Sequence, residues 1–130
     1  MWWLEMALTA AQTAADYMAS MDRVGETVSV RRYTGLGVAR TYADFEARAR
    51  TVGYEPQPMI SSHNKASAIQ QGDRKIILLA ADLDNAGFAS PITTDDKVMV
   101  RGMELAIIAA DDSTRRVNGT LIAYELQVRG

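Results

Sequence analysis

The pattern of apolar positions changes from a helical period to a strand period near residue 25. The stretch TAAQTAADYMASM, from Thr9 to Met21, is rich in helix-forming residues, and Thr9 can cap its start. Gly25 breaks the pattern. Apolar residues spaced by three and four positions form one narrow stripe, which we expect to pack closely on this chain or on a neighbour. The residues predicted to make these partner contacts are Leu8, Ala11, Ala15 and Met18, with Met21 next in the series.

From residue 26 onward, apolar and polar residues alternate as in a half-buried strand. In ETVSVRRY, Val28 and Val30 share one face, while polar residues occupy the other. The following TGLGVART is a glycine-rich turn. We therefore predict a strand over 26–33 that ends in this turn.

Residues 42–54, YADFEARARTVGY, fit two interpretations. Their alanine, glutamate and arginine content favours helix, and Thr41 with Asp44 resembles a cap. However, Phe45, Ala47 and Ala49 alternate with charged residues, as in a strand. We predict a strand, because a hairpin with 26–33 would give the preceding strand a partner.

The second half of the chain predicts further short strands separated by turns. Residues 74–83, RKIILLAADL, form a β-rich apolar run that is typical of a buried strand, and 84–96 is predicted to be loop. The Arg-Gly turn at 101–102 predicts a hairpin of 98–100 with 104–109. Another turn covers 112–120, and a last strand closes the chain. The predicted core comprises Ile77, Leu79, Val98, Val100, Leu105, Ile107, Ile122, Tyr124 and Leu126.

These elements predict a mainly β fold, a small antiparallel β-barrel or sandwich with an N-terminal α-helix and a long inter-strand loop. We expect a single domain over 1–130, in which 1–25 form an N-terminal arm and helix and 26–130 form the barrel with its loop at 55–71. Compact domains rarely contain so long a segment without regular pattern unless the segment has a function or is disordered.

Composition narrows the possible functions. The 130 residues carry a net charge of −2, with 48% hydrophobic and 23% charged residues and no cysteine. The charge argues against a general binder of nucleic acid or anionic membranes. The lack of cysteine excludes disulfides, thiolate metal sites and a cysteine nucleophile.

The apolar start MWWLEMAL does not resemble a signal peptide or a membrane span, because Glu5 interrupts it and no basic region precedes it. Two interpretations remain for its first residues. Translation starts naturally at Met6, which makes residues 1–5 an upstream extension, or Trp2 and Trp3 pack on a partner.

Candidate chemistry is sparse. His63 has no second histidine or cysteine with which to share a metal, and the pairs Asp95–Asp96 and Asp111–Asp112 lie where turns commonly use aspartate. The arginine pairs in VSVRRY and STRR fit either solvated strand edges or intersubunit salt bridges. No set of residues suggests a nucleophile with a base and an orienting group. We therefore expect no enzyme, no cofactor and no catalytic or metal site.

Three short motifs occur in an order that resembles a known family. They are Gly72–Asp73 before an apolar strand, the segment from Asp96 to Gly102 with the pattern D-x-V-x-V-x-G, and a final Y-x-L-x-V-R-G from Tyr124 to Gly130. Over roughly 26–130, their order and spacing resemble the head–tail connector proteins of long-tailed bacteriophages, more narrowly the head-completion or stopper type.

The resemblance implies a structural virion protein of a siphovirus neck, assembled in the host cytoplasm. It implies a ring of six or twelve copies below the portal or adaptor ring, which closes the DNA exit channel and provides a docking surface for the tail terminator or tail tube. It implies no membrane partner. In that family a loop between the second and third main strands enters the channel near the packaged DNA. The corresponding residues here are Pro58, Met59, Ile60, Ser61, Ser62, His63, Asn64 and Lys65.

Other functions fit the same pattern. A tail terminator or another tail-end ring protein is also small, β-rich and ring-forming. A monomeric β-barrel binding module for oligonucleotides should show aromatic residues interleaved with basic residues on its strands. The acidic net charge and the few strand aromatics argue against that module.

Overall fold

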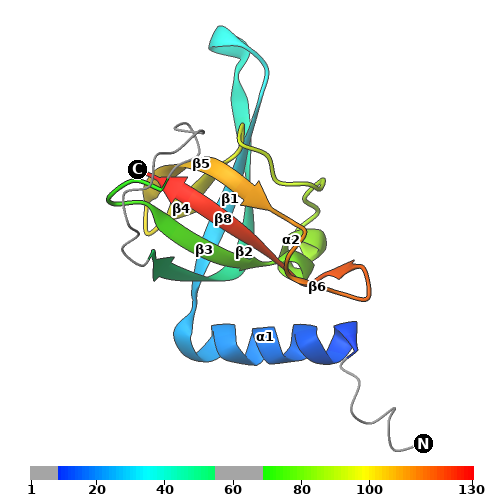
Figure 1. Cartoon of the computed structure of the whole chain (residues 1–130). Helices are drawn as coiled ribbons and strands as arrows, with labels where there is room; N and C mark the ends of the chain where they lie inside the picture. Colours follow the sequence, from blue (N-terminus) through cyan, green and yellow to red (C-terminus); the bar gives the residue numbers. More distant parts are fainter. Residues whose placement is uncertain (1–8, 55–68) are drawn as a thin grey trace, which may run out of the picture.

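A computed structural model describes residues 9–54 and 69–130 and contains a closed antiparallel barrel of six strands (Figure 1). Around the barrel the strands follow the order β1-β2-β3-β8-β5-β4, and β4 pairs with β1 to close it. The predicted small β-barrel with an N-terminal helix is thus confirmed. The barrel strands are β1 (Glu26–Thr34), β2 (Thr41–Gly53), β3 (Arg74–Leu79), β4 (Lys97–Val100), β5 (Met103–Asp111) and β8 (Ala123–Arg129).

The ambiguous segment after the glycine-rich turn is a strand, as predicted. It forms a long hairpin with β1, in which Glu26 lies opposite Ala49 and Thr34 lies opposite Thr41. Its apolar phase is also as expected, because Ala47 and Ala49 are buried while the adjacent Glu46, Arg48 and Arg50 are not. Cross-strand pairing thus outweighs the helix propensity of alanine and glutamate in this segment.

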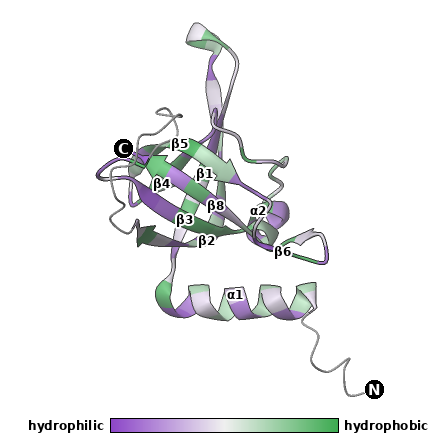
Figure 2. Cartoon of the chain, in the orientation of Figure 1, coloured by the Kyte–Doolittle hydropathy of each residue, from purple (hydrophilic) through white to green (hydrophobic). Residues whose placement is uncertain are grey.

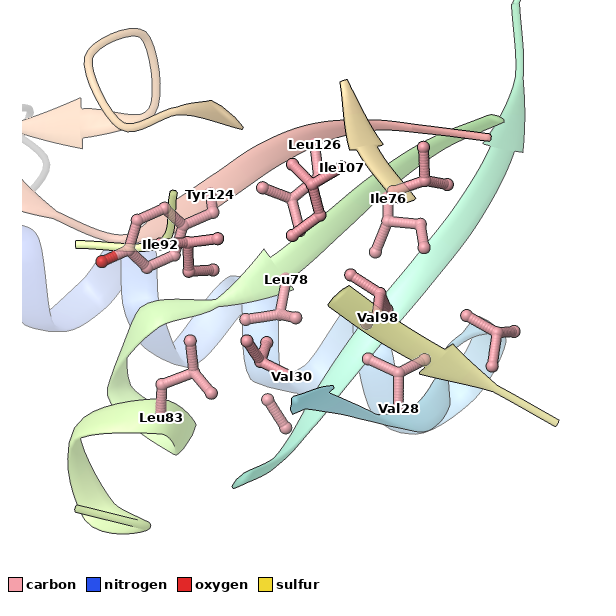
Figure 3. Packing of buried hydrophobic residues seen from close by; sticks show 14 of the residues in the cluster. Val28, Val30, Ile76, Leu78, Leu83, Ile92, Val98, Ile107, Tyr124 and Leu126 are labelled. Atoms are coloured by element: carbon pink, nitrogen blue, oxygen red, sulfur yellow. The ribbon is translucent and has the colours of Figure 1, made fainter. Parts of the chain in front are cut away.

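Alternate residues of the barrel strands point inward and form the core (Figure 3). Of the predicted core residues, eight are buried and Ile77 is not. The phase of β3 was therefore wrong by one position: Ile76 and Leu78 face the core, whereas Ile77 is half-buried. A run of four consecutive apolar residues carries no alternation from which the inward face can be read.

The end of the apolar run 74–83 is not strand but a short helix, α2 (Ala80–Asn85). The backbone N–H of Ala80 donates to the carbonyl of Ile122, and Leu83 enters the core cluster (Figure 3). The segment 84–96, which was predicted to be only a loop, also contributes to the core, because its Phe88 and Ile92 are buried in the same cluster. Helix α2 and this loop thus supply core side chains that the strands do not.

Helix α1 (Ala10–Val24) lies alongside the barrel (Figures 1 and 2). Thr9 and Gln12 form a reciprocal capping box, as the cap prediction requires. At the other end, a Cβ on Gly25 would come within 2.6 Å of the carbonyl oxygen of Ala49, so the helix approaches β2 closely there. Among the described residues of α1, Met21 is buried.

Two small elements complete the described chain. The 3-10 turn η2 (Gly37–Ala39) lies in the glycine-rich turn between β1 and β2. The predicted turn at 112–120 contains a small two-stranded ribbon, β6 (Arg116–Val117) with β7 (Thr120–Leu121). Asn118 and Gly119 connect its strands with positive φ angles of 50° and 80°, as in the Asn-Gly hairpin turns that match strand twist.

Candidate assembly surface

The outer part of the β1–β2 hairpin extends beyond the barrel (Figure 1). On the β1 side, strand β4 pairs only with residues 29–31, and on the β2 side, strand β3 pairs only with residues 49–53. Residues 32–46 therefore have strand pairing only within the β1–β2 hairpin itself among the described residues. We call this segment the distal hairpin.

The tip of the distal hairpin includes hydrophobic residues (Figure 2). Leu36 is 89% exposed and Val38 is fully exposed. Gly35 and Gly37 have positive φ angles of 83° and 57°, which glycine adopts without steric cost. The tight turn thus holds two apolar residues away from the body of the protein.

Four side chains stack along the outer face of the distal hairpin and its base. The guanidinium carbon of Arg31 lies 3.9 Å from the centre of the Tyr42 ring, and that of Arg40 lies 3.8 Å from the centre of the Tyr33 ring. The two rings meet edge to face, with 5.7 Å between their centres. Because each contact joins residues from the two strands or their turn, the stack stiffens the hairpin.

Ion pairs at the base attach the hairpin to the barrel. Arg31 donates from Nε and Nη2 to the two carboxylate oxygens of Asp44 at 2.8 and 3.0 Å, and this pairing lowers the pKa of Asp44. Glu104 on β5 accepts hydrogen bonds from Arg31 and from the Tyr33 hydroxyl. Arg32 pairs with the buried Asp96 at 2.8 Å. Both arginines of VSVRRY are thus engaged within the chain.

The other arginine pair is also held within the chain. Arg115 donates from Nη1 to the Tyr17 hydroxyl of α1 at 2.9 Å. Arg116 donates from Nε to the backbone carbonyl of Asp112 at 2.6 Å. These contacts connect the small β6–β7 ribbon to helix α1 and to the end of β5.

The free edge of β2 begins at Arg48. The backbone N–H of Arg48 points away from β1 and donates to Oδ2 of Asp82 on α2 at 2.8 Å. The Arg48 side chain donates to the same carboxylate, and these hydrogen bonds lower the pKa of Asp82. Toward the tip, no described strand pairs with the outer edge of residues 41–46.

Each of the three motifs that carry the family resemblance contains a residue that forms an ion pair within the barrel. Asp73 follows Gly72, whose φ is 91°, and accepts hydrogen bonds from Arg129 in the last motif. Asp96, which opens the middle motif, pairs with Arg32 of β1. The motif residues therefore hold the barrel together.

The structure describes some of the residues that were predicted to contact partners and not others. Trp2, Trp3 and Leu8 lie outside the described residues, as do all eight residues of the predicted channel loop, 58–65. Within α1, Ala11 and Ala15 are exposed and Met18 is half-buried. At the ends of the long loop, Gly53 pairs with Arg74 across β2 and β3, so the chain leaves and re-enters the barrel at adjacent positions.

The acidic pairs serve turns, as expected. Asp96 accepts from the backbone N–H of Thr93 at 2.9 Å, and Asp111 accepts from Ser113 at 2.7 Å. Within residues 9–54 and 69–130, no three histidine, cysteine or acidic side chains gather as metal ligands would. No helix of the described chain is long and apolar enough to span a membrane.

Sequence reasoning missed the distal hairpin as a surface. The signal was present, because Leu36 and Val38 are apolar residues that alternate with glycines inside a turn, where burial is rare.

The sequence matches no protein-family model, and a search of curated proteins gives no match.

Proposed function

We propose that the chain is a structural ring component of the neck of a long-tailed bacteriophage. In this role it closes the DNA exit channel below the portal or adaptor ring and provides the surface on which the tail docks. The observation that carries the proposal beyond the motif resemblance is the distal hairpin, which places Leu36 and Val38 in solvent at the end of a stiffened strand pair.

An exposed apolar tip supports assembly with another protein. Contiguous exposed apolar groups mark interaction sites. Leu36 and Val38 lie together at one tip and are the most exposed large hydrophobic residues of the described chain. Beyond Arg32 and Phe45 at its base, the distal hairpin contributes little to its own barrel, since the other core residues of β1 and β2 lie at 28–30 and 47–49. Its length and stiffness are explained if it contacts a neighbouring subunit or an adjoining ring.

The long segment between β2 and β3 supports the channel role. It connects two adjacent, hydrogen-bonded strand ends, for which a short turn would suffice. Its extra length is therefore not needed to close the barrel. In a ring, such a segment can reach a channel that the barrel itself does not fill.

One feature of the structure, the stacked arginines and tyrosines of the hairpin, would fit the oligonucleotide-binding alternative. The stacked Arg31, Tyr33, Arg40 and Tyr42 interleave basic and aromatic residues, as a single-strand binder would. However, the guanidinium groups already cover the Tyr33 and Tyr42 rings, and Arg31 is neutralised by Asp44. Few ring faces remain for bases, so we favour assembly over strand binding.

The test is complementation of the encoding phage after deletion of this gene. Wild-type protein should restore filled heads joined to tails, and it should appear at the neck in class averages with six- or twelve-fold rotational symmetry. The double variant Leu36→Ser/Val38→Ser should keep the thermal stability of the wild type but fail to restore joined particles. Met103→Ser, at an exposed apolar position outside the hairpin, is the matched control and should restore them.

Absence of the protein from purified particles would refute the neck role. Full complementation by the Leu36→Ser/Val38→Ser variant would show that assembly does not need the apolar tip of the hairpin. In that case the proposal would rest on the long β2–β3 segment alone.

A further inference from the structure

We propose that two copies of the free protein pair through the outer edges of their β2 strands. The pairing is antiparallel, and the two-fold axis passes beside Ala43. It joins the two distal hairpins into one four-stranded sheet in the order β1-β2-β2-β1.

The first step is the direction of the backbone groups. In an antiparallel strand, alternate residues turn both their N–H and C=O groups to the same side. The N–H of Arg48 points outward to Asp82. Glu46, Asp44 and Tyr42 have the same parity and therefore also turn their backbone groups outward. No described strand pairs with that edge, which can accept a strand from another molecule.

The second step is register. A two-fold pairing places residues opposite one another at equal distances from the axis, and outward residues must meet outward residues. An axis at Ala43 places Arg40 opposite Glu46 of the second copy and Tyr42 opposite Asp44 of the second copy. An axis at Asp44 would oppose two carboxylates, which is unfavourable. An axis at Tyr42 would place Glu46 opposite Val38 in the turn of the second copy.

The third step is charge. Arg40 and Glu46 are both exposed, and neither forms an ion pair with another described residue. Asp44, by contrast, is already paired with Arg31. The register at Ala43 is thus the one of the three that matches the two charges that remain unpaired. Symmetry makes this match twice in each dimer.

The inference does not rest on the proposed neck function. A contact that uses the same edge on both copies closes as a dimer and cannot extend around a ring of subunits that all face the same way. The dimer therefore concerns the protein before assembly. Its test uses purified protein alone, so it can fail or succeed without regard to the role in particles.

A charge exchange tests the register. Sedimentation equilibrium of the full chain over a dilution series should give a mass that rises from 14.2 kDa to about 28 kDa, twice the chain mass. Arg40→Glu alone and Glu46→Arg alone should each raise the dimer dissociation constant about tenfold or more, because two like-charge contacts form in each dimer. The double variant Arg40→Glu/Glu46→Arg should restore the wild-type constant. Circular dichroism of each variant checks that the barrel remains folded.

Cross-linking tests the position of the axis. The chain has no cysteine, so Ala43→Cys introduces a single thiol. Directly opposed residues at a position like Ala43 have Cα atoms about 4.5 Å apart, which is within the range of a disulfide. Mild oxidation should therefore convert Ala43→Cys to a covalent dimer, whereas Leu36→Cys, which is 89% exposed but far from the axis, should remain largely monomeric.

Three results would overturn the proposal. One is a monomeric mass at every concentration without cross-linking of Ala43→Cys, which would mean that the edge charges keep copies apart. Another is a double variant as weak as the single variants. The third is preferential cross-linking of Leu36→Cys, which would indicate contact between tips instead of edges.

Discussion

Arg129 near the end of the chain donates two hydrogen bonds to Asp73, from Nε to Oδ1 at 2.8 Å and from Nη2 to Oδ2 at 2.9 Å. The Asp73 side chain is completely buried, and it also accepts from the backbone N–H of Gln70 and from Nε2 of Gln127. One carboxylate therefore holds both the turn before β3 and the last strand, which are neighbours in the barrel.

We expect Asp73→Asn to lower the free energy of unfolding by about 3 kcal/mol, because it removes a charge-assisted pair and leaves donors facing a buried amide. Urea unfolding at neutral pH measures this loss. Asp95→Asn is the control, since Asp95 is exposed, and its effect should stay within about 0.5 kcal/mol. Equal losses in the two variants would show that the Arg129 pair does not stabilise the barrel.

The same carboxylate predicts a dependence on pH. Hydrogen bonds from Arg129, Gln70 and Gln127 lower the pKa of Asp73 well below its usual value of 3.8. The unfolded chain thus binds this proton before the folded chain does, so the stabilisation is complete above the unfolded pKa and is lost as pH falls toward the folded one. Wild-type protein should lose stability between about pH 5 and pH 2. Asp73→Asn should lose less over that interval, and parallel curves would contradict the assignment.

The fold could be predicted from those segments of the chain that have a regular apolar period or a clear turn or cap signal. The alternation in β1, β2 and β8, the Thr9 cap and the Arg-Gly turn all follow from local periodicity or turn chemistry, and all were predicted. Segments without alternation were misread. The uniform run in β3 hid the inward face, and helix α2 is held by Leu83 in the core and by the Asp82–Arg48 contact, both of which involve residues distant in sequence.

The candidate surface was harder to predict for a related reason. Leu36 and Val38 looked like ordinary turn residues, because their exposure depends on how far the hairpin extends beyond its neighbouring strands. The ion-pair partners of Arg31 and Arg32 likewise come from β2 and from the loop before β4. Local sequence cannot show which distant carboxylate an arginine will meet.

The corrected phase of β3 gives a direct comparison between neighbouring isoleucines. Ile76→Ala should lower the free energy of unfolding by about 2–5 kcal/mol, because Ile76 is fully buried in the core cluster and its loss leaves a cavity. Ile77→Ala should cost less than half as much, since Ile77 is half-buried on the other face. Urea unfolding of both variants measures the difference. A larger loss at Ile77 would restore the phase predicted from the sequence.

Deletion of residues 58–67 separates the fold from the proposed channel role. Gly53 and Arg74 are already in register across β2 and β3, so the shortened segment still joins adjacent strand ends. Because the entropy of loop closure changes slowly with length, the free energy of unfolding should change by less than about 1 kcal/mol. The same variant, supplied to the phage that lacks this gene, should leave heads that lose DNA or fail to join tails.

A control variant separates the length of this segment from its sequence. Replacement of 58–67 by a glycine-serine linker of equal length keeps the length and removes the sequence. Normal yields of filled heads and infectious particles with the deletion would remove the channel role, and a large loss of stability would show instead that the segment supports the barrel.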